Sequence, residues 1–94
     1  MNTQSCDCHK VKPGELKNPG DFYIELVPNG ATYIFVLLPD GTGNNLPIEI
    51  NKGPALSPRC WGWDGNEDKP TLTPSIHCIG SWHGWLRAGR LISC

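Results

Sequence analysis

Cysteine and histidine are the residues of this chain best able to bind a metal ion. The N-terminal segment contains Cys6, Cys8 and His9, and the C-terminal third contains Cys78 and, five residues later, His83. A structural zinc ion takes four such ligands in a tetrahedron. We therefore expect Cys6, Cys8, Cys78 and His83 to form a zinc site that also anchors the N-terminal segment. In the alternative interpretation, buried cysteines pack as small apolar side chains and the others are free thiols.

Nucleophilic catalysis is a second kind of chemistry that the residue types allow. It needs a hydroxyl group beside a histidine base that a third group orients. Ser75 and Thr71 lie close in sequence to His77 and His83, and Asp64 could orient an imidazole. However, the chain has no Gly-x-Ser-x-Gly motif, and 94 residues leave little room for a closed pocket. From sequence we assign no catalytic residue.

All four tryptophans lie in the last third of the chain. Because side chains alternate along a strand, Trp61 and Trp63 share a face, whereas Trp82 and Trp85 lie on opposite faces. Tryptophans of this kind either fill the core or form a recognition surface, and Trp and Arg are favoured at binding hot spots. We select Trp63, Trp85 and Arg87 as candidate partner-binding residues.

The elements that must position these residues are short strands. Eleven glycines and nine prolines separate short apolar runs, as is typical of all-β domains. We predict a small antiparallel sandwich or a partly open barrel of about six or seven short strands, with little or no helix. Segments with strand-like sequence, from which these strands are drawn, are 22–27, 31–38, 46–50, 60–64, 71–72, 75–79, 82–87 and 90–93, with turns at Asn29-Gly30 and Ala88-Gly89.

Residues 1–20 are polar and are expected to form an N-terminal arm, while residues 21–94 form a single β domain with a signature segment at 60–94. The balance of nine acidic and eight basic residues, without a basic cluster, argues against nucleic acid as a partner. No apolar run approaches the ~20 residues of a membrane span. The N-terminus does not resemble a signal peptide, so we expect a cytoplasmic protein without disulfides. A chain this short has a thin core, so stabilisation by self-association stays open.

Four motifs in the last third resemble those of a known family: Trp61-Gly-Trp-Asp-Gly65, Pro70-Thr-Leu-Thr-Pro-Ser-Ile76, His83-Gly-Trp-Leu86 and Gly89-Arg-Leu91. The family is a small domain of unknown function that is common in bacteriophages and prophages and is often labelled ammonia monooxygenase. Its longer members resemble zinc-binding domains, with a cysteine before the motif histidine and a Cys-x-x-Cys pair upstream. Here Trp82 precedes His83 and no Cys-x-x-Cys is present, so Cys78 and the pair Cys6 and Cys8 would take those places.

The resemblance implies a viral protein in the host cytoplasm or the virion. We therefore expect a non-enzymatic accessory module of phage type, stabilised by zinc, with a virion protein or a host factor as its partner. Two alternatives remain open. One is a small metal-dependent enzyme, with His77, Cys78 and His83 as ligands and Asp64 as base. The other is a module that binds a nucleotide-like host signal between tryptophans.

Overall fold

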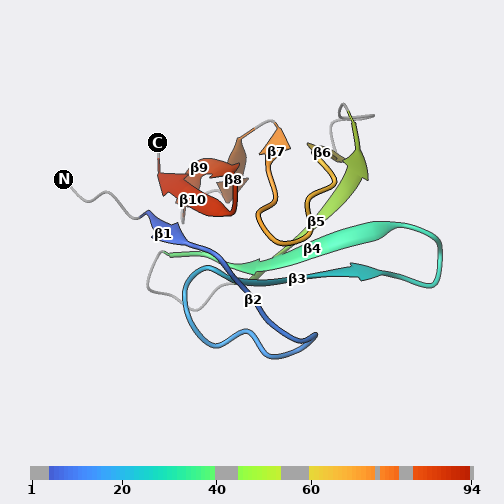
Figure 1. Cartoon of the computed structure of the whole chain (residues 1–94), viewed down its shortest axis with the longest axis horizontal. Coiled ribbons are helices and arrows are strands. Elements are labelled where there is room, and N and C mark those ends of the chain that lie inside the picture. Colours follow the sequence, from blue (N-terminus) through green and yellow to red (C-terminus); the bar gives the residue numbers. More distant parts are fainter. Residues whose placement is uncertain (1–4, 40–44, 54–59, 74, 79–81, 94) are drawn as a thin grey trace.

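Two β-sheets make up the domain. The computed structural model describes residues 5–39, 45–53, 60–73, 75–78 and 82–93. These residues contain ten short strands and no helix, and the sheets do not close into a barrel (Figure 1). Because they contain no helix, they also contain none long and apolar enough to cross a membrane. The prediction of an all-β fold is confirmed.

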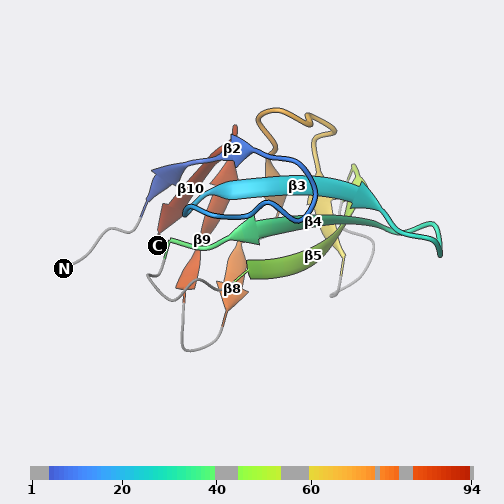
Figure 2. The same cartoon turned by 90° about the horizontal axis from the view of Figure 1, so that it is seen from below.

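The sheets have four and six strands. The order in the four-stranded sheet is β1 (Cys6–Asp7), β10 (Arg90–Ser93), β9 (Trp82–Arg87) and β8 (Ile76–Cys78). The order in the six-stranded sheet is β2 (His9–Lys10), β3 (Asp21–Leu26), β4 (Thr32–Leu37), β5 (Asn45–Lys52), β6 (Trp61–Trp63) and β7 (Leu72–Thr73). The sheets lie in separate layers, with β8, β9 and β10 behind β3, β4 and β5 (Figure 2).

Both predicted hairpins form. Between β3 and β4, Gly30 has a φ of +91°, and the Asn29 side chain accepts a hydrogen bond from the Ala31 N–H at 2.9 Å. Between β9 and β10, Ala88 and Gly89 have φ angles of +48° and +73°. Two consecutive residues with positive φ match the twist of a tight antiparallel hairpin. Local sequence therefore determines these two connections.

One apolar core joins the sheets. Side chains from both sheets form a single cluster of buried residues, namely Phe22, Ile34, Val36, Leu38, Ile48, Ile50, Trp63, Leu72, Ile76, Trp82, Leu86 and Leu91. Trp63 and Trp82 belong to it, so two of the four tryptophans fill the core. Burial of this apolar surface is the main driving force for packing the sheets together.

The N-terminal arm contributes a short strand to each sheet. β1 pairs with β10 in the four-stranded sheet, and β2 pairs in parallel with β3 in the six-stranded sheet. Between them, the Cys8 N–H donates to the Gly89 carbonyl at 2.9 Å, and the His9 N–H donates to the Gly20 carbonyl at 3.0 Å. Residues 6–10 therefore cross from one layer to the other and hold the layers together.

Candidate active site

Ser75 lies where the chain passes from one sheet to the other. It follows β7, an edge strand of the six-stranded sheet, and directly precedes β8, an edge strand of the four-stranded sheet. The indole Nε1 of Trp61 donates a hydrogen bond to the Ser75 carbonyl at 3.2 Å. Trp61 is itself packed against the core. The backbone of Ser75 is therefore held by a large, partly buried side chain.

The side chain of Ser75 meets His83. The distance between Ser75 Oγ and His83 Nε2 is 3.1 Å, which is within the hydrogen-bonding range of a hydroxyl nucleophile and its imidazole base. Alternation along β9 directs Trp82 inwards and His83 towards solvent. Gly84 accommodates the Trp82 indole, because a Cβ at that position would lie 2.6 Å from Trp82 Cζ2. The buried indole thus fixes the strand that presents His83.

A second imidazole lies against the first. His77 is the cross-strand partner of His83 in the antiparallel pairing of β8 and β9. The ring centroids are 4.5 Å apart and the planes differ by 28°, so the rings are stacked. Within the described residues, the Ser75 hydroxyl and the His77 ring are the partners of the His83 side chain. The stack and the hydrogen bond to Ser75 are therefore the two described contacts that restrict the orientation of the His83 ring.

Asp64 was expected to orient an imidazole, but its described hydrogen bonds are to the backbone. Its Oδ1 accepts hydrogen bonds from the backbone N–H groups of Asn66, at 3.0 Å, and Thr71, at 3.2 Å. These bonds close the loop between β6 and β7. The described part of the chain therefore holds no carboxylate hydrogen-bonded to His83, and the pair of Ser75 and His83 is a dyad.

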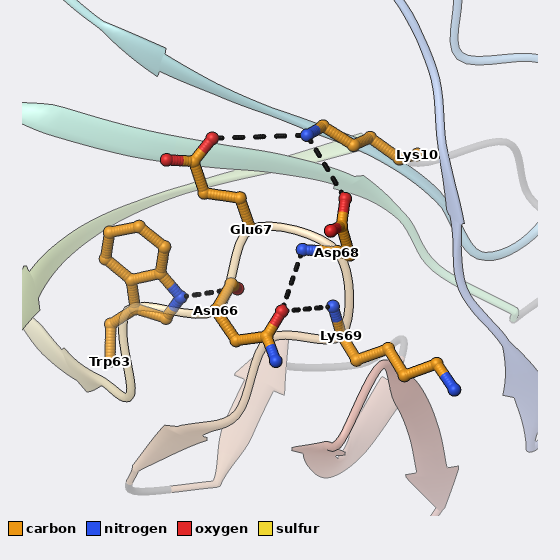
Figure 3. A network of polar contacts seen from close by, with 6 residues as sticks. All are labelled: Lys10, Trp63, Asn66, Glu67, Asp68 and Lys69. Carbon is orange, nitrogen blue, oxygen red and sulfur yellow. Dashed lines mark hydrogen bonds and ion pairs between the residues drawn. The ribbon is translucent and has the colours of Figure 1, made fainter.

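The loop between β6 and β7 is organised by its own polar groups (Figure 3). Asn66 Oδ1 accepts from the N–H groups of Asp68 and Lys69, both at 2.9 Å, while the Asn66 carbonyl accepts from Trp63 Nε1 at 3.1 Å. Lys10 of β2 reaches the loop, with its Nζ 3.4 Å from Asp68 Oδ1. The loop that leads into β7 is thus tied both to the core and to the N-terminal arm.

A cleft lies along β6, β7 and the loop between them. It has a volume of about 340 Å³ and is lined by Gly53, Gly62, Trp63, Asp64, Thr71 and Thr73. Thr73 is two residues before Ser75, so their Cα atoms are at most ~7 Å apart. Gly62 follows Trp61, the residue that holds the Ser75 backbone. Neither Ser75 nor His83 lines the cleft, and Thr73 is the lining residue nearest to Ser75 in the sequence.

The residues predicted to bind zinc do not converge. Cys6 is in β1 and Cys78 is in β8, and these strands are opposite edges of the four-stranded sheet. Two strands separate them, which corresponds to about 14 Å at the usual spacing. His83 faces Ser75. No group of three or more His, Cys, Asp or Glu residues able to hold a metal ion occurs in the described ranges. The expectation of a zinc-binding protein is therefore not supported by the part of the chain that the structure describes.

The residues predicted to bind a partner are divided between the core and the surface. Trp63 is only 7% exposed and belongs to the core cluster. Trp85 and Arg87 lie on the outward side of β9, where the Arg87 guanidinium carbon is 4.3 Å from the centre of the Trp85 ring. The three residues do not form one surface, but Trp85 and Arg87 do form a pair.

Comparison with known proteins identifies the family of the chain. A family model described as the bacterial ubiquitination-like system serine protease (BubE) matches residues 8–94. The chain belongs to the BubE family. The match covers 87 of its 94 residues and includes Ser75, His77 and His83. Searches of curated proteins and of solved structures found no match.

Membership of the BubE family corrects three predictions. The resemblance to a phage domain labelled ammonia monooxygenase is wrong, because the matching family is a bacterial serine protease. The viral assignment is wrong for the same reason. The expectation of a non-enzymatic accessory module is also wrong, and the alternative of an enzyme agrees better with the family.

Sequence reasoning considered Ser75 and His83 but set them aside because no Gly-x-Ser-x-Gly motif is present. That motif describes the strand-to-helix turn of α/β-hydrolases and says nothing about a β-sandwich. Serine catalytic groups recur on unrelated folds and are recognised by geometry. The usable signal was the short Ser75-x-His77 and His83 spacing across a predicted hairpin.

Proposed function

We propose that this chain is a serine-type peptidase of a bacterial ubiquitination-like system, with Ser75 as the nucleophile and His83 as the general base. The observation that carries the proposal is the 3.1 Å distance between Ser75 Oγ and His83 Nε2. The BubE family supports both the reaction class and the biological system.

The geometry supports acyl transfer in two steps. In the first, His83 Nε2 takes the proton of Ser75 Oγ as the oxygen attacks the carbonyl carbon of the scissile amide. His83 then gives this proton to the leaving amine, the C–N bond breaks, and the acyl group is an ester on Ser75. In the second step, His83 takes a proton from water, which attacks the ester. The proton returns to Ser75 Oγ as the carboxylic acid product leaves.

Trp61 and His77 orient the two reacting residues, Ser75 and His83. Trp61 holds the backbone of Ser75 through its 3.2 Å hydrogen bond, and the His77 ring lies against that of His83. Holding the reacting groups in the attacking geometry lowers the entropic part of the activation barrier. The cleft lined by Thr73 is the place for a substrate side chain.

A fluorophosphonate probe tests this proposal, because it reacts with activated serines without needing the natural substrate. We expect the probe to label the wild-type chain on Ser75, as located by peptide mass spectrometry. Ser75→Ala should remove the label, and His83→Gln should slow labelling by at least about 10³-fold. Ser5→Ala is the matched control, since Ser5 precedes β1 at the opposite edge of the same sheet.

Labelling of the Ser75→Ala variant at the wild-type rate would refute the assignment of the nucleophile. Equal labelling of the His83→Gln variant would refute the role of His83. Circular dichroism of each variant establishes that it has the same all-β fold, so that loss of labelling is not loss of structure.

A further inference from the structure

The outward face of β9 carries three functional groups in a row. His83, Trp85 and Arg87 alternate with the inward residues Trp82, Gly84 and Leu86. Residues two apart on a strand point to the same side, so the first three share the solvent-facing side of the sheet. His83 and Arg87 are exposed, and Trp85 is half-buried. The face that contains the catalytic histidine therefore also contains an accessible aromatic ring and a cation.

Arg87 is oriented but not neutralised. Its guanidinium carbon lies 4.3 Å from the centre of the Trp85 ring, the geometry of a cation–π contact. Among the residues that the structure describes, Arg87 forms no ion pair, whereas neighbouring Arg90 lies 3.7 Å from Asp7. Stacking on the indole leaves the edge of the guanidinium free for a planar acceptor. A carboxylate is the group that fits this edge in a two-bonded arrangement.

The sheet as a whole differs in charge from the rest of the chain. Its four strands contain two arginines, two histidines and a single acid, Asp7, which is paired with Arg90. The other eight acidic residues lie outside these strands, although the net charge of the chain is −1. With the histidines neutral, the four strands have a net charge of +1, two arginines less one aspartate, and Arg87 is the cation that could pair with a negatively charged group.

We propose that Trp85 and Arg87 form the docking surface for an acidic segment of the polypeptide substrate. This inference rests on the proposed function, because the segment is placed by its distance from Ser75 and His83. Along β9, Arg87 is four residues from His83, or about 13 Å. An extended peptide covers that distance in about four residues. The substrate therefore carries Asp or Glu about four residues from its scissile bond, beside an apolar group that contacts Trp85.

The test uses internally quenched peptide pools that differ only in Glu, Gln or Lys fixed at that position. We expect the wild-type chain to show a KM for the Glu pool about fivefold lower than for the Gln pool, with a similar kcat. This modest factor is what an exposed ion pair provides. Arg87→Gln should abolish the preference for Glu, and Arg87→Glu should transfer it to the Lys pool. Lys12→Gln, at an exposed cation outside this sheet, is the matched control and should retain the wild-type preference.

A binding measurement compares the Glu and Gln peptides without cleavage. The Glu and Gln peptides are titrated into the Ser75→Ala variant while the indole N–H signal of Trp85 is followed by NMR. The Glu peptide should shift this signal at lower concentration than the Gln peptide, and Arg87→Gln should remove the difference. Equal responses to the two peptides, or a preference that survives Arg87→Gln, would overturn the inference.

The two proposals fail differently. The fluorophosphonate probe is too small to need the docking surface, so labelling of Ser75 in the wild-type chain tests the proposed function by itself. Absence of labelling in every variant counts against the proposed function. Normal labelling together with no preference for acidic peptides counts against the docking surface alone.

Discussion

Removing the stacked imidazole of His77 should slow catalysis without weakening substrate binding. His77 and His83 are directly opposite each other on β8 and β9, with ring centroids 4.5 Å apart. Aromatic pairs of this kind are worth about 0.5–1.5 kcal/mol. If this energy restricts His83 to the ring orientation that reaches Ser75 Oγ, its loss lowers kcat by about 2- to 13-fold, at ~1.36 kcal/mol per factor of ten. KM should stay unchanged for His77→Ala.

The matched variant is His77→Phe, which keeps a flat ring at the same position but has no nitrogen. If stacking is what matters, His77→Phe should recover most of the kcat lost in His77→Ala. Steady-state kinetics with a cleavable peptide measure both parameters. An unchanged kcat in His77→Ala would refute the reasoning. Equal loss in the Ala and Phe variants would also refute it, because it would show that the ring nitrogens, not the stack, are required.

Two further predictions concern stability and thiol chemistry. Gly84→Ala should lower Tm by at least about 5 °C, because the added Cβ would clash with the Ile92 carbonyl oxygen and would lie 2.6 Å from Trp82 Cζ2, and such overpacking costs about 1–3 kcal/mol. Ser93→Ala, at the cross-strand partner of Gly84, adds no atom and is the control; an equal loss there would contradict the steric explanation. Burial, with a smaller contribution from repulsion by Cys6, raises the pKa of the Cys8 thiol from 9.0 to about 12. Alkylation of Cys8 by iodoacetamide at pH 8 should therefore be about 10³-fold slower in the folded chain than in urea. Because the unfolded thiol loses its proton first, the free energy of unfolding should fall as pH rises from about 9 towards 12. Equal alkylation rates in the two states would contradict this.

Much of the fold follows from local sequence. The predicted strands 82–87 and 90–93 have the bounds of β9 and β10, and the Asn29-Gly30 turn joins β3 to β4. These features depend on alternating apolar residues and on turn residues that accept positive φ, and both are readable in a single sequence. The two-residue strands β1 and β2 were not predicted. They exist only through pairing with β10 and β3, and two residues are too few to show a periodicity.

The site was predictable in its members but not in its arrangement. Ser75 and His83 were both recognised as chemically able residues, yet His83 was assigned to a zinc site with cysteines. What decides between these roles is the register of β8 on β9, which places His77 opposite His83 and brings Ser75 alongside. Register is a property of the folded sheet, so residue type and spacing alone could not choose.

Small size is not an argument against a peptidase of this kind. A small-molecule enzyme needs a pocket that encloses its substrate, whereas a polypeptide can be bound extended along strands and need not be enclosed. Ser75 lies between two edge strands, β7 and β8, and the face of Trp85 and Arg87 runs along β9. Thr73, two residues before Ser75, lines a cleft of about 340 Å³. The packed core supplies rigidity at this point through Trp61 and Trp82. A thin sandwich is therefore sufficient, because it has to fix two side chains and leave the adjoining surface open.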